Sequence, residues 1–410
     1  MNILVINGDC IQTNSSANLC HLAYIRGLLE AGYQVTLLSA DGRDYKIDSS
    51  MKIPDEVTTY TIYGVSLYEK MSLKKRNSKN NVWSSEKYNS KKLSINNVVH
   101  KGISKMKELV LALYGAHGIY STFVHKAQKF ELDENFDYVI SISTPVASHL
   151  LTYNLLKSEH IKGNHWIQIW EDPWYSDVYG FNRKRKIFRE ERRILSFAEK
   201  VCYVSPLTLK KQKQLFPESA HKMFWQPLPF YYQDNTKYDV LTNEKHYGYF
   251  GDYIPVSRDL EPFYIAAKEM GIDVNICGNP KNLFKSTEKI HIYPRLPLNE
   301  LKMIEDDTNV LVFLCNRQGG QIPGKIYQYS ATEKTILFIL DGTEDEKRIL
   351  KKYFGKFNRY IFCENTVEDI TRAISIINEG QIGCVKDYPL DYFEPQKIIQ
   401  KVLNATGEEI

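Results

Sequence analysis

The sequence lacks any apolar run long enough to cross a membrane, and the apolar stretch at its start ends after residue 8. Because that stretch is short and carries no basic residue, it does not resemble a secretory signal. The seven cysteines include no Cys-x-x-Cys pair, which disfavours a zinc site or a disulfide framework and favours a reducing compartment. A net charge of +4 gives no indication of a nucleic-acid partner. We therefore predict a cytoplasmic protein that does not bind nucleic acid.

Two missing motifs argue against common cofactors. After the first predicted strand, residues 2–7, the chain has Gly8 but not the three spaced glycines that hold a dinucleotide pyrophosphate. No Asp-x-Asp motif is placed to hold a metal ion. We therefore predict no cofactor and no metal, and we interpret the loop from Asp9 to Ser16 as one that faces a substrate.

What the chain does contain is enough sequence for two domains. Its 410 residues exceed one ordinary hydrophobic core, and a hydrophobic content of 43% with 25% charged residues is typical of globular proteins. A tract rich in proline and polar residues, from Gln226 to Asn243, separates two halves. We predict a first domain over 1–228, a second over 229–387, and a C-terminal helix within 388–410.

Short apolar runs of β-forming residues alternate with helix-spaced segments in both halves, which predicts a Rossmann-like α/β sheet in each. In the first half we expect strands over 2–7, 34–39, 137–143, 165–170 and 200–205. We expect helices there over 17–31, 103–115 and 183–193, one that follows Pro145 and runs through Leu156, and one that starts at Pro206. In the second half we expect strands over 246–251, 272–277, 290–293, 310–314, 335–340 and 360–363, and helices over 259–269, 298–305, 325–331, 367–377 and 394–403.

Two carboxylates follow the strand predicted over 165–170. Glu171 and Asp172 come directly after it, with Trp174 and Tyr175 next in the chain. Ligands of open α/β sheets bind at such strand ends. Carboxylates accept hydroxyl protons and aromatic faces cover sugar C–H groups, so this set suits a polyhydroxylated ligand. A helix-entry turn capped by the aspartate is the alternative.

A glycine-rich segment follows the strand predicted over 310–314. Gly319, Gly320, Pro323 and Gly324 lead into a helix that starts at Lys325. A strand–glycine loop–helix arrangement exposes backbone N–H groups at the positive end of a helix, which favours an anion such as phosphate. Lys325 would add a full positive charge. The alternative is an ordinary solvated loop with a surface lysine.

Two segments are strongly basic, an insertion at about 70–107 and the helix over 183–193. Basic segments that contain aromatic residues, as the insertion does at Trp83, can lie on an anionic membrane surface. A solvated loop and a solvated helix face are the alternatives.

Three tracts carry a resemblance to a known family: EERRILSFAEKVCYVSPLTLKKQ from Glu190, YFGDYIPVSRDLEPFYIAA from Tyr249, and GGQIPGKIYQYSATEKTILFI from Gly319. They look like the nucleotide-sugar glycosyltransferases of the GT-B fold, most of all the large retaining family that builds bacterial polysaccharides. The most specific signal is the Pro-x-Lys-x-x-Gln-Tyr motif from Pro323. The resemblance implies two Rossmann-like domains that face a cleft, with a C-terminal helix that crosses back to the N-terminal domain.

The resemblance also implies residue roles, with departures from the family pattern. Lys325 matches a lysine that holds the donor diphosphate, and Arg258 could fill a second cationic position. The paired glutamates of the family fall on Gly320 and Gln328, and the chain has Asp252 where the family often has arginine. Gln328 could still hydrogen-bond a ribose diol.

We therefore expect a hexosyltransferase-type enzyme that moves a sugar from a nucleoside-diphosphate sugar to a glycan or lipid-linked acceptor in bacterial cell-surface polysaccharide synthesis. The expected catalytic residues are Lys325, Arg258 and Asp172. The base of an inverting reaction could be Asp172 or one of the histidines His117 and His125, although the resemblance favours retention. The expected donor-binding residues are Gly251, Gly278, Gly319, Gly320, Pro323, Gly324 and Gln328. The expected acceptor-side residues are Gly8, Thr13, His117 and His125. A nucleotide-sugar epimerase and a non-catalytic subunit of a glycan-assembly complex are the alternatives.

Overall fold

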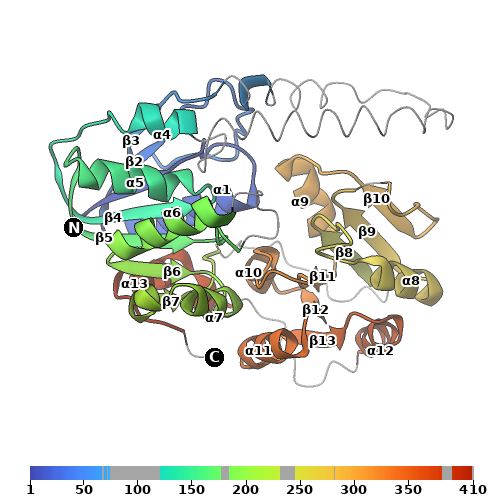
Figure 1. The fold of residues 1–410 in the computed structure, drawn as a ribbon. Helices are drawn as coiled ribbons and strands as arrows, with labels where there is room; N and C mark the ends of the chain where they lie inside the picture. Colours follow the sequence, from blue (N-terminus) through green and yellow to red (C-terminus); the bar gives the residue numbers. More distant parts are fainter. Residues whose placement is uncertain are drawn as a thin grey trace, which may run out of the picture. The chain divides into compact units, whose positions relative to one another are not determined.

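A computed structural model gives the structure of the protein (Figure 1). It describes residues 1–66, 69–71, 73, 121–176, 184–230, 245–280, 282–380 and 390–408. The chain divides into two compact units, residues 1–22 with 32–201, and residues 23–31 with 202–410. The division passes through the first helix and through the strand that begins at Lys200.

One sheet has seven strands in the order β3-β2-β1-β4-β5-β6-β7. They are β1 (Asn2–Asn7), β2 (Gln34–Ala40), β3 (Thr58–Ile62), β4 (Asn135–Ser143), β5 (Lys162–Trp170), β6 (Lys200–Tyr203) and β7 (Met223–Trp225). The α-helices along this part of the chain are α1 (Ser16–Glu30), α4 (Ser121–Ala127), α5 (Ala147–Lys157), α6 (Lys184–Phe197) and α7 (Pro206–Leu215), and a 3₁₀ helix covers Pro217–Lys222. β1 pairs in parallel with both β2 and β4.

The other sheet has six strands in the order β10-β9-β8-β11-β12-β13. They are β8 (His246–Phe250), β9 (Asp273–Cys277), β10 (Ile290–Tyr293), β11 (Val310–Leu314), β12 (Thr335–Leu340) and β13 (Tyr360–Glu364). The helices are α8 (Glu261–Met270), α9 (Leu298–Asp306), α10 (Lys325–Ser330), α11 (Glu344–Gly355), α12 (Val367–Asn378) and α13 (Pro395–Leu403), with a 3₁₀ turn at Asp391–Phe393. β8 pairs in parallel with β9 and β11.

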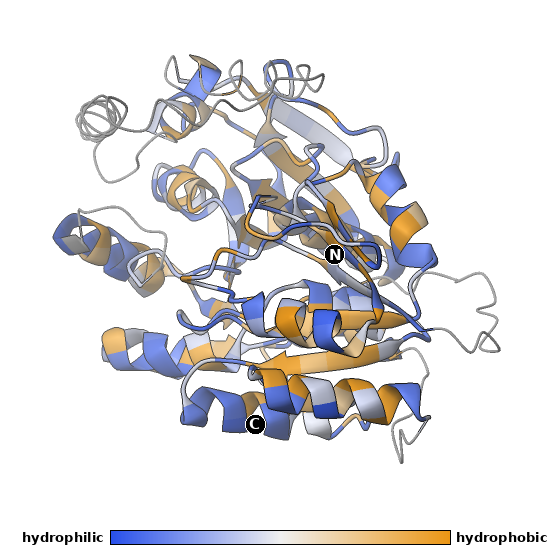
Figure 2. Ribbon diagram, turned by 90° about the vertical axis from the view of Figure 1, so that its right-hand side faces the viewer, coloured by the Kyte–Doolittle hydropathy of each residue, from blue (hydrophilic) through white to orange (hydrophobic). Residues whose placement is uncertain are grey.

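The strands supply the apolar core of both sheets. Figure 2 colours most strands as hydrophobic, whereas the helices carry one hydrophobic and one hydrophilic stripe. β11 and β12 are buried along their whole length, as expected for parallel strands covered on both faces. Most side chains of β3 are exposed, in keeping with its place at the edge of its sheet.

The last helix lies against the first. A Cβ atom placed on Gly27 of α1 would come within 2.5 Å of the carbonyl carbon of Pro395 in α13, so only glycine allows this approach. Gln396 Nε2 donates to the backbone oxygen of Glu30 at 3.1 Å. The expected return of the C-terminal helix to the N-terminal domain is therefore confirmed, because α1 is the helix that follows β1.

The α/β alternation predicted from sequence is confirmed, with some differences. The sequence-based prediction lacks β3, α4, β7 and α11, and α8 begins at Glu261, two residues later than expected. The expected helix over 103–115, most of the insertion at about 70–107 and both predicted domain boundaries lie in or next to ranges outside the described residues. Among the helices that the structure describes, none is long and apolar enough to span a bilayer.

Candidate functional site

Each sheet has one topological switch point, a pair of neighbouring strands from which the chain adds further strands toward one edge of the sheet and then toward the other. In the seven-stranded sheet this switch point lies between β1 and β4, and in the six-stranded sheet between β8 and β11. Open parallel sheets bind ligands beyond the carboxyl ends of the strands at such points. The segments that follow β8 and β11 carry Arg258 and Lys325, so both predicted cations flank the switch point of the six-stranded sheet.

The side chains of Lys325 and Gln328 lie one turn apart on α10 and reach the same carboxylate, that of Glu305 at the end of α9. Lys325 Nζ is 3.6 Å from Glu305 Oε2, and Gln328 Nε2 donates to Glu305 Oε1 at 3.1 Å. The Glu305 side chain is 12% exposed and that of Lys325 25%. An acidic group therefore stands beside Gln328 although the motif itself contains none.

Two buried tyrosines connect the Lys325 group with Arg258. Lys325 Nζ lies 5.8 Å from the ring centroid of Tyr329. Burial raises the pKa of Tyr329, and the charges of Glu305 and Tyr249 raise it further. Burial also raises the pKa of Tyr249, while the nearby Arg258 guanidinium lowers it. Arg258 Nε is itself buried without a hydrogen-bond partner, which leaves a cationic N–H group for an anionic ligand.

Close packing explains one of the predicted donor-site glycines, Gly278. A Cβ atom on Gly278 would lie 1.9 Å from the carbonyl oxygen of Gly251. A Cβ atom on Gly251 would lie 3.5 Å from Arg258 Nη1 and 3.4 Å from the Tyr249 hydroxyl. The two loops that follow β8 and β9 therefore touch backbone to backbone beside Arg258, and Gly278 is required whether or not it contacts a ligand, whereas a Cβ atom on Gly251 would make only ordinary van der Waals contacts.

The glycine-rich loop is fixed to the start of α7. The Gly320 carbonyl accepts hydrogen bonds from Ser205 Oγ at 2.6 Å and from Thr208 Oγ1 at 3.1 Å. Gly319 and Gly320 both have positive φ angles, 102° and 74°. Gly324 is the N-cap of α10, and the Pro323 carbonyl accepts from the backbone of Ile326. The loop is thus a defined turn that presents Lys325.

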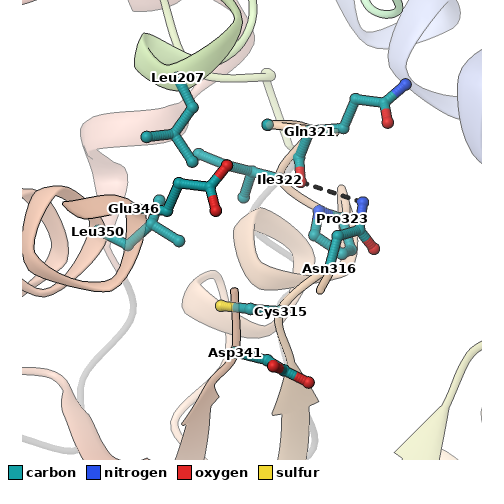
Figure 3. Close-up of a pocket in the computed structure, with 10 residues that line it drawn as sticks. Leu207, Cys315, Asn316, Gln321, Ile322, Pro323, Asp341, Glu346 and Leu350 are labelled. Carbon is teal, nitrogen blue, oxygen red and sulfur yellow. Dashed lines mark hydrogen bonds between the residues drawn. The ribbon is translucent and has the colours of Figure 1, made fainter. Parts of the chain in front are cut away.

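A small pocket lies on another side of the same loop (Figure 3). Its lining includes the buried thiol of Cys315 at the end of β11, Asp341 after β12 and Glu346 on α11. The other lining residues are Leu207, Asn316, Gly320, Gln321, Ile322, Pro323 and Leu350. Because this lining has two acids and no cation, the pocket does not suit a diphosphate.

In the first unit, the residues predicted at the ends of β1 and β5 are hydrogen-bonded to neighbouring segments of the same unit. Gly8 donates its N–H to Ser148 Oγ at 2.8 Å, and Thr13 Oγ1 accepts from Asn18 Nδ2 at 2.8 Å. Asp172 Oδ2 accepts from Thr144 Oγ1 at 2.9 Å. Gly8, Thr144 and Asp172 follow β1, β4 and β5, so the structure brings them to the same edge of the sheet.

Of the two predicted histidines, the structure describes His125, and it does not join this edge. His125 is exposed on α4 and is hydrogen-bonded to Gln128. The carbonyl of Gln128 contacts His160 Nδ1, which lies just before β5 begins. His125 therefore sits toward the starts of the strands, opposite Gly8 and Asp172. His117 lies outside the described residues.

Several polar residues near the two switch points are not among the site residues predicted from sequence. They are Glu305, Tyr249 and Tyr329 in the second unit and Asn7 and His21 in the first. Glu305 lies 20 positions before Lys325, so no local spacing links the two. Asn7, the last residue of β1, offered a weak signal, because a polar residue ending an otherwise apolar buried strand marks the ligand edge. Across the residues that the structure describes, no cluster of His, Cys, Asp and Glu is arranged to hold a metal ion.

Comparisons with known proteins agree on the fold. No protein-family model and no curated protein matches the sequence. The structure is similar to sucrose-phosphate synthase from Thermosynechococcus elongatus, with a TM-score of 0.61 and 11% identity over 99% of this chain and 95% of that one. It is also similar to a glycosyltransferase from Rickettsia africae, with a TM-score of 0.52 and 13% identity over 98% of this chain and 97% of the other. Together with the two parallel sheets, these likenesses show that the chain has the GT-B fold.

Proposed function

We propose that this protein is a glycosyltransferase that binds a nucleoside-diphosphate sugar at the switch point of its six-stranded sheet. The observation that carries the proposal is the placement of Lys325 and Arg258 on the two segments that flank this point, joined by buried Tyr249 and Tyr329. Two proteins of similar structure are a sucrose-phosphate synthase and a glycosyltransferase, which supports the same class of reaction.

The two cations would stabilise the diphosphate as it leaves. When the glycosidic bond to the diphosphate breaks, negative charge develops on the departing oxygen, and fixed positive groups lower the energy of that state. Arg258 has a buried Nε–H without a partner in the structure. Lys325 would exchange its contact with Glu305 for one with phosphate, and the Gln328–Glu305 pair would face the ribose hydroxyls.

We also propose that the sugar is transferred with retention of its anomeric configuration and without a metal ion. The acceptor would be a glycan or a lipid-linked acceptor in bacterial cell-surface polysaccharide synthesis. These parts rest on the sequence resemblance, and Asp172 remains the candidate base should the reaction invert. A non-catalytic relative would have no need for the paired cations, which is why we favour an enzyme.

The enzyme proposal is tested by release of nucleoside diphosphate from a panel of nucleotide sugars, with and without a bacterial membrane extract as acceptor source. We expect release from one nucleotide sugar, and we expect Lys325→Ala to reduce it at least 100-fold because the leaving group loses a charge-assisted contact. Lys302→Ala is the matched control, since this lysine of α9 pairs with Asp306 on the surface. A Lys325→Ala variant with near-normal release, or a wild type that releases no nucleotide, would contradict the proposal.

A membrane-bound acceptor would explain the basic face of α6. Arg185, Lys186, Arg189 and Arg192 are exposed on this helix, and Phe197 at its end is 48% exposed. Each basic residue near an anionic bilayer contributes about 1 kcal/mol of attraction. We propose that this face contacts anionic lipid.

Flotation with vesicles of phosphatidylglycerol and phosphatidylcholine tests the membrane contact. The wild type should float with anionic vesicles at low salt and less at high salt, because salt screens exposed charges. Replacing Arg185, Lys186 and Arg189 by glutamine should reduce the bound fraction several-fold. If the variant floats as well as the wild type, or the wild type stays unbound at low salt, the α6 contact is excluded.

A further inference from the structure

We propose that Arg317 is a positioning residue that holds Arg258 in place beside the diphosphate site. The inference rests on the proposed function and deepens it, because it says how one of the two assigned cations is fixed. Arg317 follows β11 and lies two residues before the glycines of the loop that leads to Lys325, whereas Arg258 lies between β8 and α8. Contacts between these two segments therefore fix Arg258 relative to Lys325.

The segment that carries Arg258 has no regular secondary structure of its own. Residues 251–260 form neither a helix nor a strand. Within them, the backbone N–H groups of Ser257 and Arg258 donate to the carbonyl oxygen of Ile254 at 2.8 and 2.7 Å, which makes a turn. The side chains of Ile254 and Val256 are exposed, so their burial does little to hold this turn. Contacts from elsewhere are needed to order it.

Arg317 supplies such contacts on both sides of Arg258. The backbone N–H of Arg317 donates to the carbonyl oxygen of Ser257 at 2.7 Å. Its side chain donates from Nη2 to Asp259 Oδ2 at 2.9 Å and from Nη1 to the carbonyl oxygen of Pro255 at 3.4 Å. Ser257 and Asp259 are the two neighbours of Arg258 in the chain, so Arg317 fixes the backbone at which the Arg258 side chain starts.

Arg317 is itself held by the segments that follow the next two strands. Its Nε lies 3.5 Å from Oδ2 of Asp341, which follows β12. Asn365, which follows β13, donates from Nδ2 to Asp341 Oδ2 at 2.8 Å and to the backbone oxygen of Asp259 at 2.9 Å. Each guanidinium nitrogen of Arg317 thus has a partner within the protein, and the planar group holds these partners in set directions. We therefore assign it an effect through Arg258 and no contact with the ligand.

The exposure of Arg317 fits a positioning role better than a role in overall stability. Its side chain is 46% exposed, and exposed ion pairs add little to the stability of a fold because water and salt screen them. Such pairs still restrict the turn locally. A cation that is already in place binds an anion more tightly than one that must first be ordered.

Hydrogen–deuterium exchange of the ligand-free protein tests whether Arg317 orders the turn. Arg317→Gln should raise the exchange rate of the amides over residues 252–260 several-fold, because local opening exposes them to water. Arg372→Gln is the matched control, since it removes another exposed arginine–aspartate pair, with Asp369 on α12. Exchange over 252–260 that is unchanged in Arg317→Gln would overturn the inference.

A double-mutant cycle tests whether Arg317 acts through Arg258. Calorimetry with UDP, GDP, CDP, ADP and dTDP gives the affinity of the wild type, Arg258→Ala, Arg317→Gln and the double variant. Arg317→Gln should weaken nucleotide binding about tenfold, and the double variant should bind no more weakly than Arg258→Ala, because coupled residues are not additive. Arg317→Lys, which keeps a cation beside Asp259, should recover part of the loss. Additive losses would overturn the inference, whereas a role in folding alone would lower the melting temperature without this coupling.

The two measurements separate this inference from the proposed function. A wild type that binds none of the five nucleotides would count against the proposed function, whereas the exchange experiment needs no nucleotide and judges the hold of Arg317 on the turn. If Arg317→Gln does not fold, Asp259→Asn weakens the same ion pair from its other side and carries the same predictions.

Discussion

Gly320 shows at the scale of one residue why the motif departs from the family that it resembles. The family has a glutamate at this position, whereas here the backbone has a φ of 74° and a Cβ atom would lie 3.3 Å from that of Leu207. A left-handed backbone conformation has a higher free energy for residues that carry a Cβ atom than for glycine. The carbonyl of Gly320 is used instead, as the acceptor for Ser205 and Thr208. The glycine is thus a structural requirement of this loop.

Replacing Gly320 by alanine should therefore destabilise the protein by about 1–2 kcal/mol, the cost of a left-handed backbone for a residue with a Cβ atom. Gly355→Ala at the end of α11 is the control, because a Cβ atom there meets nothing within 4 Å and φ is not positive. Urea unfolding of the two variants measures the difference. Equal stability would show that the loop relaxes without cost.

Glu305 shows what residue patterns do not reveal. The motif predicted the positions of Lys325 and Gln328 at the start of a helix, and the structure places them there. The carboxylate that both side chains contact belongs to α9, which precedes β11 in the sequence, whereas Lys325 and Gln328 lie on α10, which follows β11. Such a pairing depends on how two helices pack, and a local pattern contains no information about that packing. For the same reason His21, whose Nε2 lies 3.2 Å from Glu171 Oε2, could not be linked to that acid.

At the scale of elements, the loop after β5 depends on a buried acid of α6. Glu191 Oε2 accepts from the backbone N–H of Tyr175 at 2.6 Å, and its Oε1 is buried without a partner. Burial raises the pKa of Glu191 from its ordinary value of 4.5 to about 8, although hydrogen bonds from Tyr175 and Trp174 oppose the rise. The helix read from sequence as merely basic therefore also carries the acid that anchors the loop of Asp172.

This buried acid makes stability depend on pH in a defined direction. The folded protein keeps the Glu191 proton up to about pH 8, while the unfolded chain releases it near 4.5. The folded state then binds more protons between these values, so stability is full below pH 4.5 and falls as the pH rises to about 8. Glu191→Gln cannot ionise and should unfold several degrees above the wild type at pH 8.5, with little difference at pH 4.5.

Thermal unfolding across this pH range measures the effect. Glu190→Gln is the control, because Glu190 lies next to Glu191 but forms a partly exposed pair with Arg193. A wild type and a Glu191→Gln variant whose melting temperatures run parallel from pH 4.5 to 8.5 would show that Glu191 ionises normally.

Most elements could be predicted because their strands are continuous apolar runs bounded by turn residues, as in β11 and β12. β3 could not, since its side chains face solvent at the sheet edge and form no apolar run. α11 did have a signal: Thr343 and Glu346 have capping-box spacing, and the structure contains that box. It was missed because its residues are mostly charged.

At the scale of the whole molecule, the two sheets share one design. In each sheet, a strand at the switch point is followed by a polar or glycine-rich loop. The candidate ligand-binding residues lie in the segments that follow the strands on either side of this point. The second unit places Arg258 and Lys325 there, and the first places Asn7, His21 and Glu171 there.

The central claim is that the second unit binds a nucleoside diphosphate through Lys325. Its most direct test is a thermal-shift measurement with UDP, GDP, CDP, ADP and dTDP, with and without a divalent metal, on the wild type, Lys325→Ala and Lys302→Ala. Ligand binding to the folded state raises stability as RT ln(1 + [L]/Kd). We predict a metal-independent shift with one nucleotide that Lys302→Ala keeps and Lys325→Ala loses. An unchanged wild-type melting temperature with all five nucleotides, or a shift that Lys325→Ala retains, would contradict the claim.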